Sequence, residues 1–163
     1  MKILKISNTY FEKFPPQQYE LLSNQNEKGK QRPYVVILAL KYKNKKRLFA
    51  IPFRSNISNG VPKGEYFPLP PRSTTRIHRK HGLHYTKMFP VESNYFQKFH
   101  IDKNDTYFNM IVGILEKNES IIVKQAKAYI EAYENGVRSE IASKIDEIIE
   151  VLDSALTAGI NRV

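Results

Sequence analysis

The sequence of 163 residues contains no cysteine, so disulfides, thiolate nucleophiles and thiolate metal sites are excluded. It also has no apolar run near the roughly 20 residues that a membrane-spanning helix needs. The N-terminal segment, residues 1–5, lacks the apolar core and the small-residue cleavage site of a signal peptide. We therefore expect a cytoplasmic protein with no membrane partner. Any catalysis has to use hydroxyls, histidines, lysines, arginines or carboxylates.

Common nucleotide and hydrolase motifs are missing as well. The N-terminal two thirds of the chain contain no P-loop, no Rossmann glycine pattern, no Gly-x-Ser-x-Gly elbow and no cluster of paired carboxylates. Nucleotide hydrolysis and two-metal nuclease chemistry are therefore poorly supported, and we expect no cofactor.

Three of the four histidines, His78, His81 and His84, are spaced by three residues. The arginines and lysines around them disfavour a cation site, so we expect no metal. His78 and His81 are interpreted as solvated loop histidines. His84 is expected to begin a strand beside Lys87, which makes it the candidate for proton transfer or phosphate contact.

Positive charge is concentrated in one part of the chain. Residues 1–103 hold 20 Lys and Arg against 6 Asp and Glu, whereas residues 104–163 hold 6 against 10. This asymmetry favours a surface that faces a polyanion. Nucleic acid is the commonest such partner; an anionic membrane or an acidic protein is the alternative.

The hydrophobic content of 41% fits one globular domain spanning residues 1–163. The basic part is rich in β-branched and aromatic runs, which predict a small, strongly twisted antiparallel sheet or open barrel. The expected strands cover residues 2–10, 34–42, 47–53, 65–69 and 84–91.

The acidic part has the apolar spacing of helices that pack on this sheet. Asp105 and Ser120 are expected to cap two of them, and the second should stop at Asn135 and Gly136. Ser139 is expected to open a last helix. The predicted fold class is therefore α+β.

The hairpin formed by residues 34–53 is expected to deliver Arg54, Ser55 and Asn56 to a loop at the edge of the sheet. Such residues most often start a turn, although loops on a rigid edge also carry chemistry. Hydroxyls and cations suffice for RNA cleavage without a metal. In that reaction the 2′-OH attacks the adjacent phosphate, and the protein moves protons and stabilises negative charge.

Two blocks of sequence resemble the toxins of type III toxin–antitoxin systems, the group that contains ToxN, AbiQ, CptN and TenpN. One block runs through residues 30–56 and the other through residues 82–91, and the helical C-terminus agrees with them. The chain is most similar to the CptN and TenpN branches, because Arg54, Ser55, Asn56 and Ile57 stand where the ToxN branch has a Thr-Ser-Pro-Lys-like sequence.

The resemblance implies a metal-independent endoribonuclease with a twisted-barrel core related to Kid and MazF. It also implies a small structured antitoxin RNA, encoded as tandem repeats, which the toxin processes and with which it closes into a cyclic assembly. Ser55 matches the active-site serine of the family, and Lys87 matches its downstream lysine. The family's lysine after the proline has no match at Ile57, so we infer that Arg54 supplies the missing cation.

The sequence thus predicts an endoribonuclease toxin that acts on cellular or phage RNA and leaves 2′,3′-cyclic phosphate and 5′-hydroxyl ends. The candidate catalytic residues are Arg54, Ser55, His84 and Lys87, and variants of Ser55 and Lys87 are expected to keep the fold intact. A non-catalytic RNA- or DNA-binding module remains the alternative. The candidate RNA contacts are Lys30, Arg32, Tyr34, Lys43, Lys45, Lys46, Arg47, Asn56, Arg72, Arg76, Arg79 and Lys80.

Overall fold

A computed structural model describes residues 1–22, 35–100 and 102–160. Within these residues the chain is α+β, with a seven-stranded open antiparallel sheet in which β4, β5, β3, β2, β1 and β7 follow one another and β6 pairs with β3. The strands are β1 (Lys2–Ile6), β2 (Val35–Tyr42), β3 (Lys45–Ser58), β4 (Tyr66–Leu69), β5 (Arg79–His84), β6 (Phe89–Val91) and β7 (Phe96–Gln97).

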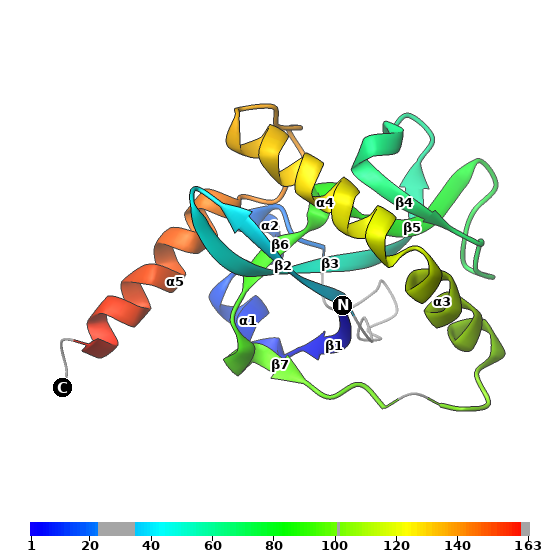
Figure 1. Ribbon diagram of the computed structural model, residues 1–163, viewed down its shortest axis with the longest axis horizontal. Helices are drawn as coiled ribbons and strands as arrows, with labels where there is room; N and C mark the ends of the chain where they lie inside the picture. Colours follow the sequence, from blue (N-terminus) through cyan, green and yellow to red (C-terminus); the bar gives the residue numbers. More distant parts are fainter. Residues whose placement is uncertain (23–34, 101, 161–163) are drawn as a thin grey trace.

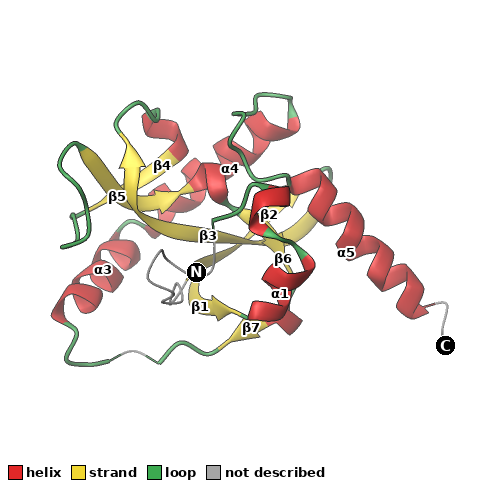
Figure 2. Cartoon of the chain, turned by 180° about the vertical axis from the view of Figure 1, so that it is seen from behind, coloured by secondary structure: helices red, strands yellow, loops and turns green. Residues whose placement is uncertain are grey.

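Helices lie on both faces of the sheet. Figure 1 shows α4 crossing one face with α3 beside it, and the reverse view in Figure 2 shows α1 and α5 on the other face. The α-helices are α1 (Asn8–Lys13), α2 (Pro16–Tyr19), α3 (Thr106–Lys117), α4 (Glu119–Glu134) and α5 (Ile145–Ile160), and the 3-10 helices are η1 (Lys63–Glu65), η2 (Tyr85–Lys87) and η3 (Ser93–Tyr95). No helix in the described ranges has the length and apolar character needed to cross a membrane.

The alternation of strand β2 explains this two-sided arrangement. Val36, Leu38 and Leu40 join the core under α3 and α4, whereas Val35 and Ile37 join the core under α1 and α5. Successive side chains of a strand point to opposite faces, so a strand that is apolar at both sets of positions needs cover on both sides. The nearly continuous apolar run of β2 therefore places it at the centre of the fold.

The predicted central hairpin is confirmed, with a tighter turn than expected. Strands β2 and β3 pair from Val35 with Pro52 to Tyr42 with Lys45, so only Lys43 and Asn44 form the loop. Both loop residues have positive φ, 48° and 63°. Two consecutive residues of this conformation form the turn that matches the twist of the flanking strands.

Several predicted boundaries were wrong. The expected strand at residues 2–10 ends at Ile6, and Tyr10 lies in α1, fully buried, because Tyr10 and Phe14 cover the second core from a helix. The expected strand at 84–91 is split by η2, so His84 ends β5 instead of beginning a strand.

Two of the predicted helix boundaries were confirmed and two were wrong. Asp105 caps α3 by accepting a hydrogen bond from the Phe108 amide, and α4 stops at Asn135, as expected. Helix α4 begins one residue before Ser120, after Asn118. The last helix begins at Ile145 and not near Ser139, which lies in the turn before it.

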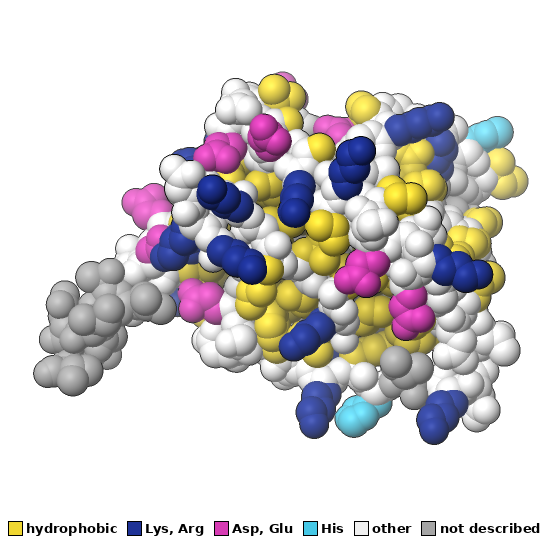
Figure 3. All heavy atoms as spheres, in the orientation of Figure 1, with side chains coloured by type: hydrophobic (Ala, Val, Ile, Leu, Met, Phe, Trp, Pro, Cys, Tyr) yellow, Lys and Arg dark blue, Asp and Glu magenta, His cyan; other side chains and the backbone are white. Residues whose placement is uncertain are grey.

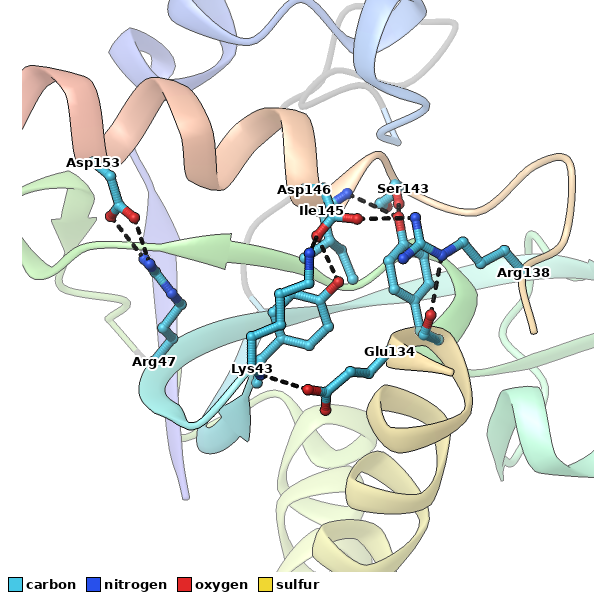
Figure 4. Close-up of polar contacts among 10 residues, drawn as sticks. Lys43, Arg47, Glu134, Arg138, Ser143, Ile145, Asp146 and Asp153 are labelled. Carbon is cyan, nitrogen blue, oxygen red and sulfur yellow. Dashed lines mark hydrogen bonds and ion pairs between the residues drawn. The ribbon is translucent and has the colours of Figure 1, made fainter. Parts of the chain in front are cut away.

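A polar junction ties the central hairpin to the start of α5 (Figure 4). Asp146 accepts a hydrogen bond from the Tyr42 hydroxyl at 2.6 Å, and it forms ion pairs with Lys43 at 3.0 Å and Arg138 at 2.9 Å. Arg138 also lies over the Tyr133 ring. Burial alone would raise the pKa of Asp146, but the hydrogen bonds from Tyr42, Lys43 and Arg138 hold it below its ordinary value of 3.8.

Asp146→Ala is expected to lower the free energy of unfolding by about 2 kcal/mol, because three partly exposed donors lose one charged acceptor. The lowered pKa means that the ionised carboxylate stabilises the fold fully above pH 3.8 and loses this effect as the pH falls through the folded-state value. Denaturant unfolding at pH 7 and at pH 3 should therefore show a smaller difference between variant and parent at pH 3. Glu150→Ala, at an exposed position of the same helix, is the control and should be near neutral. An equal loss in both variants would contradict the special role of Asp146.

Candidate functional site

Two residues of the predicted site, Ser55 and Asn56, lie at an irregularity near the end of strand β3. Arg54 pairs with Gly82 and Ile57 pairs with Lys80, so Ser55 and Asn56 together face the single residue His81. This is a β-bulge, which bends a strand and re-aims its side chains. The prediction that Arg54, Ser55 and Asn56 lie in a loop after the strand was wrong, since β3 continues to Ser58 through its pairing with β5.

Asn56 connects the bulge to the basic loop that follows β4. Its Oδ1 atom accepts a hydrogen bond from the Arg76 amide at 2.8 Å, and its Nδ2 atom donates to the Thr74 carbonyl at 3.3 Å. The tip of this loop exposes Ile77, with 85% of its surface accessible, and His78 has a φ of 65°. Asn56 therefore fixes the loop relative to Ser55.

His84 is completely buried, and neither ring nitrogen has a hydrogen-bond partner among the described residues. Burial, with a further contribution from the positive charges of Arg54 and Lys87, lowers its pKa to about 4. The imidazole is thus neutral at physiological pH. A buried polar side chain without a partner is costly, which makes it a candidate for function.

Lys87 is buried as well, which the sequence did not indicate. Its ammonium group donates to the carbonyl oxygens of Glu20 at 3.1 Å and Ile141 at 2.6 Å, and it lies 3.5 Å from the Glu20 carboxylate. It therefore joins η2 to the end of α2 and to the segment before α5. The expectation that a Lys87 variant keeps the fold intact assumed that this lysine lies outside the interior. That assumption was wrong, because the side chain is only 8% exposed.

Arg54 is half-buried beside these two residues. Burial and the nearby Arg79 guanidinium both lower its pKa. The positive charges of Arg54 and Lys87 act on the neutral His84, and that of Arg79 acts on Arg54. Ser55 follows Arg54 in the chain and lies in the bulge. Such a group of cations is suited to hold an anion and to stabilise negative charge that develops on it.

The basic residues of the hairpin divide into two kinds. Arg47 forms a bidentate pair with Asp153 at 2.6 and 3.1 Å, and Lys43 is paired with Asp146 (Figure 4). Lys45 and Lys46 are exposed. Negative charge from α5 therefore offsets part of the hairpin's positive charge.

Other candidate RNA contacts belong to the loop after β4 and to β5. Arg72 stacks on the Tyr107 ring, Lys80 donates to the Tyr66 hydroxyl at 2.9 Å, and Arg76 and Arg79 are exposed. The candidates Lys30, Arg32 and Tyr34 lie outside the described residues. On the face that carries α4, Lys and Arg side chains are interspersed with Asp and Glu and do not form one uniform patch (Figure 3).

His81 was predicted to be a solvated loop histidine, and this was wrong. It is 3% exposed, and its Nδ1 atom lies 2.9 Å from the Pro70 carbonyl oxygen and 2.8 Å from the Tyr107 hydroxyl. Burial lowers its pKa. Its place one residue from Gly82 and two from the apolar Leu83 was the available signal that it belongs to a strand. His78, by contrast, is exposed as expected.

The sequence matches no family model and no curated protein. Two solved structures share the fold. One comes from a bacterial antiviral system that a processed non-coding RNA regulates; it has a TM-score of 0.70 at 14% identity, over 92% of this chain and 96% of its own. The other comes from a bacterial type III toxin–antitoxin system in which a non-coding RNA pseudoknot selectively inhibits the toxin. It has a TM-score of 0.53 at 14% identity, over 94% of this chain and 96% of its own.

At this level of identity the comparison establishes the fold. The resemblance to type III toxins that the sequence indicated is thus confirmed in the fold, over nearly the whole chain. The relation to the Kid and MazF barrels stays a prediction.

Proposed function

We propose that this protein is an RNA-cleaving toxin of a type III toxin–antitoxin system, and that its activity is inhibited by a small structured RNA. The fold neighbours, which act in systems governed by non-coding RNA, support the class. The single observation that carries the chemistry is the buried His84, which has no hydrogen-bond partner among the described residues and lies close enough to Arg54, the neighbour of Ser55 at the β3 bulge, to feel its charge.

In the proposed reaction the 2′-OH of the substrate attacks the adjacent phosphate and expels the 5′-oxygen of the next nucleotide. Arg54 balances the charge that develops on the phosphate, and the Ser55 hydroxyl donates a hydrogen bond to a phosphate oxygen. His84 is neutral and able to accept the proton of the 2′-OH, and the expelled 5′-oxygen takes a proton from solvent to become the 5′-hydroxyl. Because its ring is buried in the free protein, it reaches the RNA only when bound phosphate draws neighbouring side chains such as Arg54 away.

Lys87 has a supporting role in this proposal. Its ammonium group donates hydrogen bonds to the carbonyls of Glu20 and Ile141, and these bonds hold η2 in place. Its positive charge acts on His84 without contact with the RNA. The resemblance to the family matches Lys87 with a lysine of the active site. In our proposal Lys87 does not contact the RNA and acts only through its charge and by positioning η2.

The proposed RNA surface follows the exposed cations around the bulge. Lys46 at the hairpin tip and Arg76 and Arg79 near Asn56 are available for phosphate contacts, because they form no ion pair within the described residues. Lys45 is exposed as well, although its charge acts on Asp153. Lys43 and Arg47 are excluded from our main surface, since Asp146 and Asp153 engage them. Lys30, Arg32 and Tyr34 remain candidates from the sequence. We also retain the proposal of a single domain that assembles with its RNA into a cyclic complex in the cytoplasm.

The purified protein is expected to cleave single-stranded RNA in excess EDTA and to leave 2′,3′-cyclic phosphate and 5′-hydroxyl ends, because the proposed groups need no metal. End-group analysis of a labelled oligonucleotide checks this result. The same sequence made entirely of 2′-deoxynucleotides should remain intact, since it lacks the attacking hydroxyl. Ser55→Ala, purified in parallel, controls for contaminating nucleases. A need for added magnesium, or cleavage of the deoxy substrate, would contradict the proposed chemistry, and RNA binding without any cleavage would favour the alternative of a binding module.

A further inference from the structure

A cavity of about 570 Å³ lies at the edge of the sheet, between β4, β5 and α4. Its wall includes the prolines Pro68 and Pro71, which are exposed, flat and apolar, and the Tyr66 side chain, which is 3% exposed. Strand β4 is the last strand on this side of the sheet, so the cavity opens beside the sheet and not within the core. Cavities of this size hold a small molecule or one part of a polymer.

The charges at this cavity have one sign. Lys63, Arg79 and Lys80 line it, and none of the described residues that line it is acidic. The Lys80 ammonium donates one hydrogen bond to the Tyr66 hydroxyl and lies over the ring, which leaves two of its N–H groups for another acceptor. The site is therefore suited to an anionic group.

Gln125 adds a specific donor to the opposite wall. Its Oε1 atom accepts a hydrogen bond from the Tyr85 hydroxyl at 2.8 Å, so the orientation of the side chain is fixed. The amide nitrogen has no partner in the part of the chain that the structure describes, and the residue lines the cavity. An acceptor on a ligand would find this nitrogen already positioned.

Arg79 connects the cavity to the cluster at the bulge. It lines the cavity, and its charge acts on Arg54. In the sheet, Arg79 pairs with Ser58 and Gly82 pairs with Arg54 on the same two strands. A chain of phosphates could thus run from Arg54 past Arg79 to the cavity.

A flat apolar wall, a fixed amide donor and three cations match the parts of a nucleotide, which has a planar base with acceptors and a charged phosphate. We propose that this cavity binds one unpaired nucleotide of the RNA that flanks the cleaved bond. The base lies against Pro68 and Pro71 and accepts a hydrogen bond from Gln125, and its phosphate lies against Lys63, Arg79 and Lys80. The inference rests on the proposed function in taking RNA as the ligand.

Binding is tested in the full chain carrying Ser55→Ala, so that cleavage does not interfere. Adding Gln125→Glu keeps the acceptor for Tyr85 but removes the amide donor, and it is expected to weaken binding of a hexanucleotide about tenfold. Adding Lys63→Ala should weaken it about threefold and reduce its salt dependence. Lys127→Ala is the control and should bind as the parent does, because Lys127 lies on α4 with Gln125 but does not line the cavity. Fluorescence anisotropy measures all four.

A second measurement locates the ligand. AMP and UMP, titrated into the same protein, should shift the NMR signal of the Gln125 side-chain amide, and inorganic phosphate should not. Equal RNA affinity in all variants, or nucleotide shifts confined to Arg54 and Asn56, would overturn the inference. Neither outcome depends on cleavage. A protein that binds nucleotides in this cavity but cleaves no RNA would contradict the proposed function and support the proposed binding site.

Discussion

His84→Leu is expected to stabilise the protein and, at the same time, to lower the rate of RNA cleavage by about a hundredfold or more. Leucine removes two buried nitrogens that have no partner in the described residues and keeps an apolar side chain in their place. A residue that only fills space would change stability without this loss of activity. The opposite signs of the two effects therefore separate a functional histidine from a packing one.

The pH dependence of stability and of cleavage tests the role of His84 independently. The pKa of His84 is about 4 in the folded state against an ordinary value of 6.5, so the unfolded chain binds more protons between these values. The parent should lose stability as the pH falls from 6.5 to 4, by up to about 3 kcal/mol, and His84→Leu should lose less. Cleavage by the parent should stay nearly constant down to about pH 5, because the imidazole remains neutral.

The control for these measurements is His100→Leu, at an exposed position away from the bulge. It should change neither cleavage nor the stability difference between pH 6.5 and pH 4. Full cleavage by His84→Leu would remove His84 from the reaction, and a strong loss of stability would mean that its nitrogens do have partners.

Gly82→Ala is expected to lower the free energy of unfolding by about 3 kcal/mol. A β-carbon at this position would lie 2.2 Å from the Phe67 carbonyl oxygen and 3.0 Å from its carbon, both backbone atoms of β4. The neighbouring strand has to move, because backbone cannot rotate out of the way as the end of a flexible side chain can. Gly82 also pairs with Arg54, so the shift reaches the bulge.

Gly113→Ala is the matched control for this change. A β-carbon there meets nothing within 4 Å, and the residue lies inside α3, where alanine is favoured over glycine by about 1 kcal/mol. The control should therefore be as stable as the parent or slightly more stable. Thermal and denaturant unfolding measure both variants, and RNA cleavage by Gly82→Ala at a temperature where it is folded should still be reduced. Equal stability of the two variants would show that β4 adapts without cost.

The sequence by itself determined the elements whose signals are local. The apolar run of β2, the turn at Asn44, the capping of α3 by Asp105 and the stop of α4 at Asn135 all depend on residues a few positions apart. Propensity and capping act over that range, and therefore these features could be predicted. The resemblance that indicated the fold was likewise carried by two short blocks of sequence.

Only the tertiary structure decided the state of the chemical groups. Lys87 is buried because carbonyls 67 and 54 positions away accept its hydrogen bonds, and Arg47 is paired because Asp153, 106 positions away, lies beside it. The bulge at Ser55 exists because β5 pairs on both sides of it, and Gln125 and Tyr66 line one cavity only because α4 crosses the sheet edge. The burial, the pKa and the hydrogen-bond or ion-pair partners of these side chains depend on contacts between distant segments. Those contacts form only when the sheet and its two layers of helices are assembled.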